Sequence, residues 1–139
     1  MEMKKRLEEV KKFLGKQDFV RVAYIFGSVA EGRQGPLSDF DFAVFLEENL
    51  SKRDIRDKKM FLINGISSIM RSDNFDLVIM NEASLLMKNN IIKHGKVLKS
   101  DRSRMAFEAR IMCDYLDRKY YEDMHANITL ERISRKGIL

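Results

Sequence analysis

The chain has 139 residues, of which 45% are hydrophobic and 34% are charged. This composition is typical of a globular protein and excludes a disordered chain, and the length predicts one domain spanning residues 1–139. Twenty-six Lys and Arg against 21 Asp and Glu leave a net charge of +5, which favours anionic ligands. The basic residues are scattered and Trp is absent. We therefore favour solvated helix faces over a nucleic-acid surface.

The single cysteine, Cys113, excludes an intrachain disulfide and a Cys-based zinc cluster, and it suits a reducing compartment. Cys113 stands at helical spacing from Ala109 and Leu116, which predicts a buried structural thiol. No uncharged apolar run approaches the length of a membrane span. We expect a soluble, cytoplasmic protein that does not enter a membrane.

The first half of the chain is predicted to contain one helix and two strands. Apolar residues recur at helical spacing from Met3 to Leu14, and Gly15 ends the pattern. Phe19 to Phe26 is rich in Val, Ile, Tyr and Phe, which indicates a strand. Val29 to Pro36 contains glycines and the only proline, which favours a loop. Asp39 to Leu46 is predicted to be a second strand.

A long helix is predicted to follow, because Ser51 and Asp54 resemble a capping box and the apolar residues after them keep the helical period to about Arg71. Phe75 to Met80 is a predicted third strand. We expect Asn81 to cap the next helix, which continues to about Lys93.

The C-terminal region is predicted to contain a short strand and two further helices. Lys96 to Lys99 is the short strand, and the helices occupy about residues 101–135, one around Met105 to Leu116 and one around Met124 to Ile133. The fold class is α/β or α+β, with a small mixed sheet, flanking helices and a core at about residues 10–100. The strands before and after the Gly27 loop are too closely linked for a crossover helix between them.

The segment between the first two predicted strands carries the chemical signal. A strand that ends in Gly27-Ser28 and turns toward a helix start lets backbone N–H groups approach an anion closely. The Ser28 hydroxyl can then contact phosphate. Arg33 lies in the same loop and could bind a triphosphate with two hydrogen bonds, although loop arginines are common.

Asp39 and Asp41 lie two residues apart in the second predicted strand, so both side chains should project from one face, with Phe40 and Phe42 on the other. Two carboxylates roughly 4 Å apart repel by about 4 kcal/mol at an effective dielectric near 20, so a cation should offset them. A pair of Mg²⁺ ions would do so and would bind nucleotide phosphates as well. Asp76, in the third predicted strand, is the candidate third carboxylate.

Gly27-Ser28, ten intervening residues and then Asp39-x-Asp41 form a pattern that resembles the signature of the DNA polymerase β-like nucleotidyltransferase superfamily. The small size of the chain makes it similar to the minimal nucleotidyltransferases of the MntA type, the antitoxin partners of HEPN-domain toxin ribonucleases. The resemblance covers roughly residues 10–120, and residues 27–41 carry its specific motif.

The resemblance implies a polymerase β-like fold and transfer of AMP from ATP, with two Mg²⁺ ions, to a hydroxyl of a cognate HEPN toxin, typically a tyrosine. By residue, it implies that Gly27 and Ser28 hold the triphosphate and that Asp39 and Asp41 hold the metals. Asp76, if it faces them, would bind one metal and help to deprotonate the acceptor. Such an enzyme is a protein adenylyltransferase, whose partners would be ATP and the cognate HEPN toxin, and both a homo-oligomer and a hetero-oligomer are compatible with the sequence.

Two alternatives remain open at this stage. The chain could be a non-catalytic antitoxin that neutralises its partner by binding alone. It could also be a nucleotidyltransferase that acts on a small molecule or on RNA, for which the basic pI of about 9.3 is the support. Substitution of Asp39 or Asp41 distinguishes a catalytic antitoxin from one that acts by binding alone.

Overall fold

The computed structural model describes residues 2–26 and 40–135 of the chain. Helices and strands alternate along it, as expected for an α/β or α+β fold. In chain order the elements are α1 (Glu2–Gly15), β1 (Val20–Phe26), β2 (Phe40–Leu46), α2 (Lys52–Met70), β3 (Phe75–Ile79), the 3₁₀ turn η1 (Met80–Glu82), α3 (Leu85–His94), β4 (Lys96–Lys99) and α4 (Arg104–Arg135).

The strands form one four-stranded mixed sheet in the order β3-β2-β1-β4. β1 is antiparallel to both β2 and β4, whereas β2 and β3 are parallel. The parallel pair requires a crossover connection, and α2 supplies it. The small mixed sheet predicted from the sequence is therefore confirmed.

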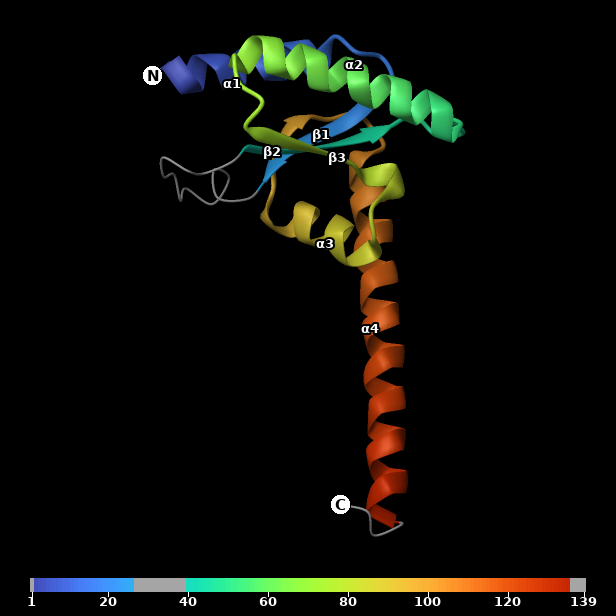
Figure 1. The fold of residues 1–139 in the computed structure, drawn as a ribbon. Helices are drawn as coiled ribbons and strands as arrows, with labels where there is room; N and C mark the ends of the chain where they lie inside the picture. The colour runs from blue at the N-terminus through green and yellow to red at the C-terminus, as the bar shows by residue number, and fades with distance from the viewer. Residues whose placement is uncertain (1, 27–39, 136–139) are drawn as a thin grey trace.

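One face of the sheet is covered by α1 and α2, as the upper layer of Figure 1 shows. The main hydrophobic core lies between these helices and the sheet, where alternate strand residues such as Ile25, Phe42 and Leu77 point toward them. The predicted core positions Phe40 and Phe42 both belong to this cluster; Phe42 is fully buried. Strand alternation thus directs Asp41, which lies between them, to the opposite face.

The opposite face of the sheet carries a smaller core beneath which α3 and the start of α4 lie (Figure 1). Tyr24 and Ala43 from the sheet pack here with Ile91 of α3. The Phe45 ring lies 4.1 Å, centroid to centroid, from the Phe107 ring of α4. α3 and α4 are therefore anchored to this face.

Serine side chains begin two of the helices. Ser51 caps α2 by accepting a hydrogen bond from the Asp54 backbone N–H at 3.1 Å, as the sequence predicted. Asn81, predicted to cap the following helix, does not: Ser84 caps α3 by accepting from the Met87 backbone N–H. The Asn81 side chain instead bonds both the N–H and the C=O of Leu46, at 2.9 and 3.0 Å. The prediction was wrong because the Asn81 side-chain amide is engaged by the backbone of Leu46, at the end of β2.

The two helices predicted for the C-terminal region are one continuous helix, α4. Residues 104–135 contain neither Gly nor Pro, so nothing in the sequence stops the helix. Cys113, predicted to be buried, is exposed, because it lies two residues from the buried Ile111 and residues two apart in a helix face different sides. Within residues 2–26 and 40–135, no helix combines the length and apolar character that a membrane span requires.

Candidate active site

Asp41 and Asp76 meet at one end of the parallel strand pair. Asp41 is the second residue of β2 and Asp76 is the second residue of β3, and their Cα atoms are register partners. Register partners in a parallel pair point to the same face of the sheet. Asp76 is exposed and Asp41 is half-buried. The topology therefore brings two carboxylates side by side that are 35 positions apart in the sequence.

The face that carries this acidic pair is the one opposite α1 and α2. Asp41 alternates with Ala43, and Asp76 alternates with Val78; both of these apolar residues belong to the smaller core. The end of β1 lies beside the pair, since Phe26 is the register partner of Asp41. Gly27 and Ser28 follow Phe26 directly in the chain.

The other predicted site residues lie outside the described residues. These are Gly27, Ser28, Arg33 and Asp39. Among the described residues, no group of three or more His, Cys, Asp or Glu could hold a metal ion. The described part of the chain thus supplies two carboxylates, whose oxygen atoms are the ligands that Mg²⁺ prefers. Asp39, which was predicted to bind metal together with Asp41, immediately precedes β2 in the sequence.

Comparison with known proteins decides the family. The family described as polymerase beta, nucleotidyltransferase matches residues 8–104. The chain belongs to this family. The resemblance inferred from residues 27–41 is thereby confirmed, and the acidic pair belongs to a nucleotidyltransferase domain.

A protein related to this nucleotidyltransferase in sequence is the protein adenylyltransferase MntA of Aphanizomenon flos-aquae (strain 2012/KM1/D3). The two are 33% identical over 92 residues, which make up 63% of this chain and 61% of the relative. The match therefore spans less than two thirds of the curated relative. It confirms the expected likeness to the MntA type.

Solved structures share the fold of this nucleotidyltransferase. One, described as a toxin–antitoxin with AMP-PNP, superposes with a TM-score of 0.69 at 21% identity and covers 88% of this chain and 98% of its own. Another, described as tri-AMPylated Shewanella oneidensis HEPN toxin in complex with MNT antitoxin, gives a TM-score of 0.65 at 19% identity, covering 94% of this chain and 99% of its own. At such identities the likeness establishes the fold.

A tyrosine on the acid-bearing face ties the nucleotidyltransferase sheet to α4. The Tyr24 hydroxyl donates a 2.7 Å hydrogen bond to Glu108, which also pairs with Arg104 at 3.2 Å. Burial raises the pKa of the Tyr24 hydroxyl, and the bond to the Glu108 carboxylate raises it further. Neither Tyr24 nor Glu108 was predicted from the sequence to have a role here. The available signal was a Tyr in a buried strand, since a buried hydroxyl needs a partner.

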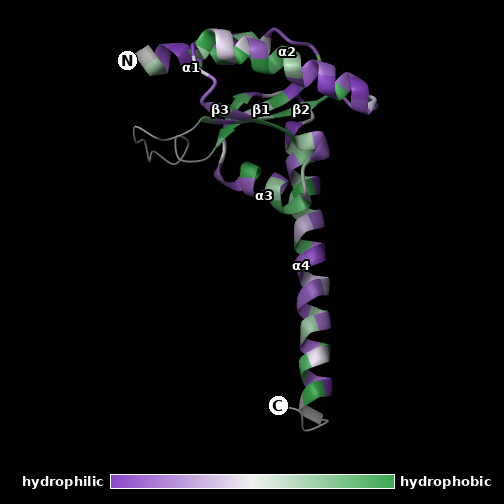
Figure 2. Cartoon of the chain, in the orientation of Figure 1, coloured by the Kyte–Doolittle hydropathy of each residue, from purple (hydrophilic) through white to green (hydrophobic). Residues whose placement is uncertain are grey.

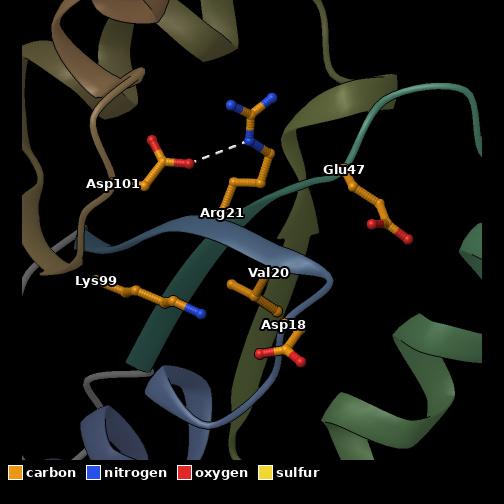
Figure 3. Close-up of a pocket in the computed structure, with 6 residues that line it drawn as sticks. All are labelled: Asp18, Val20, Arg21, Glu47, Lys99 and Asp101. Atoms are coloured by element: carbon orange, nitrogen blue, oxygen red, sulfur yellow. Dashed lines mark hydrogen bonds and ion pairs between the residues drawn. The ribbon is translucent and has the colours of Figure 1, made fainter.

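A pocket of about 360 Å³ lies at the opposite end of β1 from the acidic pair (Figure 3). Its basic groups are already engaged. Arg21 donates to Asp101 at 3.1 Å and to Ser103 at 2.8 Å, and the Lys99 ammonium donates to the Gln17 carbonyl at 2.8 Å. The Arg21 bonds join the start of β1 to the segment that leads into α4. The Lys99 bond joins β4 to the segment that precedes β1. The pocket is therefore a structural junction of the nucleotidyltransferase domain.

The junction lowers the pKa of the Asp101 carboxyl. Desolvation acts to raise its pKa, but hydrogen bonds from Ser103 and Arg21, together with the positive charge of Arg21, outweigh that effect and hold the pKa of this carboxyl below its ordinary value. The charge on Asp101 is thus used in holding β1 against the start of α4.

Proposed function

We propose that this chain is a Mg²⁺-dependent protein adenylyltransferase that transfers AMP from ATP to a hydroxyl, on a tyrosine, of a HEPN-domain toxin, and so acts as an antitoxin. The observation that carries the proposal is the acidic pair, Asp41 and Asp76, at the end of β1 from which Gly27-Ser28 continues. Family membership supports the reaction class. The relative named protein adenylyltransferase and the fold shared with an MNT antitoxin support the acceptor class.

The proposed site has a triphosphate-binding part and a metal-binding part. Gly27 and Ser28 would bind the triphosphate, with Arg33 as an additional contact. Asp39, Asp41 and Asp76 would hold two Mg²⁺ ions. When bound, such ions neutralise the phosphate charge and stabilise the charge that develops during transfer.

The proposed reaction moves one phosphoryl centre. The acceptor hydroxyl oxygen forms a bond to the α-phosphorus of ATP, and the bond from that phosphorus to the bridging oxygen breaks, so pyrophosphate leaves with the electron pair. The hydroxyl proton must pass to a base. Asp76 is suited to accept it, because its carboxylate is exposed next to Asp41. A single cysteine suits a reducing compartment, which supports a cytoplasmic location in this proposal.

The test is transfer of label from ATP radiolabelled at the α-phosphate to a HEPN-domain toxin from the same genome. We expect label on that protein in the presence of Mg²⁺, and none after chelation. Asp41→Asn and Asp76→Asn should each lower the rate by roughly 100-fold, the order of loss when a transition-state charge contact is removed. Asp57→Asn on α2, in the opposite layer, is the matched control and should keep full activity.

The binding-only alternative makes a different prediction for the same variants. If the chain neutralises its partner only by binding, Asp41→Asn would neutralise the toxin as well as the unaltered chain does. Absence of label on a partner that demonstrably binds would refute the adenylyltransferase proposal. Label on RNA or on a small molecule in place of the partner protein would favour the alternative that the chain is a nucleotidyltransferase acting on such a substrate.

A further inference from the structure

α4 is far longer than its attachment to the domain requires. It has 32 residues, and at about 1.5 Å per residue this is roughly 48 Å. Near its start, Phe107 packs against the smaller core and Ile111 is buried. From Met112 to Arg132, every residue except Tyr115 is exposed. In Figure 1 this part of α4 runs away from the sheet well beyond α3.

The projecting part of α4 carries a continuous apolar row, which we call the α4 ridge. Its members recur every fourth residue and are between 37% and 64% exposed: Met112, Leu116, Tyr120, Met124 and Ile128. Residues four apart form one of the ridges by which helices pack into grooves of other helices. Alternating apolar and polar segments along the helix are visible in Figure 2. A lone helix in water is only marginally stable, so a ridge of this length indicates a partner.

The charges on α4 indicate what kind of partner. Residues 104–135 contain six acidic and six basic residues, so the helix is neutral overall with both signs interspersed. A nucleic-acid or anionic-lipid surface would be met by an excess of basic residues, which this helix lacks. Interspersed charges beside an apolar row instead suit a protein surface with an apolar groove and a polar rim.

A hollow adjoins the ridge on the side toward α3. Its volume is about 510 Å³, and its walls include Leu86 at the start of α3 and Tyr115, Lys119 and Asp123 of α4. Leu86 is 57% exposed. Lys119 and Asp123 each precede a ridge residue in the sequence. A projecting row of side chains next to a hollow favours a folded protein partner, because the large side chains that anchor protein interfaces occupy such hollows.

The position of α4 relates this surface to the acidic pair. α1 and α2 cover one face of the sheet, and Asp41 and Asp76 project from the other. α4 is anchored to that second face through Phe107 and projects from it (Figure 1). A protein that lies along α4 is therefore on the side of the sheet that carries the acids. An acceptor hydroxyl has to be brought to that same side.

We infer that the α4 ridge and the adjoining hollow are the docking surface for the protein that receives AMP. This inference rests on the proposed function for the identity of the partner, the HEPN-domain toxin. The ridge gives affinity and the acidic pair gives chemistry, so the two can be disabled separately. Methionines at two of the five ridge positions suit this role, because their flexible side chains adapt to a partner surface.

The experiment uses the full chain and a HEPN-domain toxin from the same genome. The ridge variant is Leu116→Glu with Tyr120→Glu, and Met60→Glu, at a 53% exposed methionine on α2, is the matched control. Isothermal titration measures binding, and transfer of α-labelled AMP measures chemistry. We expect the ridge variant to bind at least tenfold more weakly while its far-UV circular dichroism and its affinity for AMP-PNP stay unchanged. Met60→Glu should bind normally.

The two proposals fail in different ways. Asp41→Asn should bind the partner normally and transfer AMP roughly 100-fold more slowly. If the unaltered chain binds the partner but transfers no label, the proposed chemistry fails while the docking surface stands. If the ridge variant binds as tightly as the unaltered chain, the docking inference is overturned.

Two further outcomes would also overturn the docking inference. One is that the unaltered chain does not bind the partner. The other is that the chain alone is a dimer in light scattering and the ridge variant is a monomer that still binds the partner. A second copy of the chain would then cover the ridge.

Discussion

Asp41 of β2 and Asp76 of β3 are register partners on the face of the sheet that α1 and α2 leave uncovered. Adjacent strands lie about 4.8 Å apart, and two unit negative charges at about 5 Å repel by roughly 3 kcal/mol at an effective dielectric near 20. Two carboxylates in register therefore repel each other, and this repulsion opposes folding unless other charges offset it. Proteins accept such costs at sites where a ligand later compensates them.

The first prediction separates the folding role of Asp76 from its ligand role. In metal-free buffer, Asp76→Asn should unfold at the same temperature as the unaltered chain or a few degrees higher, because it removes one of two neighbouring negative charges. With Mg²⁺ and AMP-PNP, the unaltered chain should be stabilised by about 3 kcal/mol at a hundredfold excess over Kd. The variant should lose most of this gain. Thermal unfolding followed by circular dichroism measures both.

Asp57→Asn is the control for this first prediction, because Asp57 is an exposed acid on α2, in the layer away from the pair. It should respond to Mg²⁺ and AMP-PNP as the unaltered chain does. If Asp76→Asn kept the full ligand-induced gain, Asp76 would have no part in holding the metal, and the proposed site would have to rely on other residues.

The second prediction concerns alkaline pH and the bond between Tyr24 and Glu108. The folded state holds the Tyr24 proton above the usual tyrosine pKa of about 10. A raised pKa contributes stability that is fully present below pH 10 and declines as the pH rises above it. The unaltered chain should therefore lose unfolding free energy above pH 10. Tyr24→Phe should show a flatter curve there and be about 1–2 kcal/mol less stable at neutral pH.

Urea unfolding at a series of pH values from neutral to alkaline measures this second prediction. Tyr121→Phe is the matched control, since that tyrosine is exposed on α4 and should leave both the neutral stability and the alkaline slope unchanged. An unaltered slope in Tyr24→Phe would mean that other groups control the alkaline transition.

The sequence predicted the elements that carry the candidate site because their signals are local. The content of Val, Ile, Tyr and Phe placed β1, alternation in β2 assigned Phe42 to the core, and the serine cap at Ser51 placed the start of α2. The facing of Asp76 could not be predicted. It depends on the register between β2 and β3, and a shift of one residue reverses the face of every side chain.

The errors share one physical origin, which is that tertiary contacts override local pattern. Asn81 has the chemistry of a helix cap, but its side-chain amide forms hydrogen bonds with the backbone of Leu46 at the end of β2. Cys113 has the helical spacing of a core residue, but the contacts of α4 bury Ile111 on another side of the helix and leave Cys113 exposed. Periodicity identifies an apolar face of a helix without saying whether the same chain covers it.

The last prediction concerns how closely α1 and α2 pack over the sheet. Gly65 of α2 lies under the Phe13 ring of α1, and a β-carbon added at Gly65 would stand 2.1 Å from the Phe13 Cζ atom. Phe13 in turn contacts Phe61, with ring centroids 5.9 Å apart. Because no side chain fits at residue 65 while the ring stays in place, Gly65→Leu should lower the unfolding free energy by about 1–3 kcal/mol.

This loss would be a packing effect, because leucine favours a helix over glycine by roughly 0.8 kcal/mol and should otherwise stabilise α2. Gly15→Leu is the control, as a β-carbon there would meet nothing within 4 Å, and it should be neutral. Removing the ring should reveal the coupling. In a Phe13→Ala background, Gly65→Leu should cost less than it does in the unaltered chain, since the space under the ring is then free. Equal costs in the two backgrounds, measured by urea unfolding, would mean that Phe13 does not set the distance between α1 and α2.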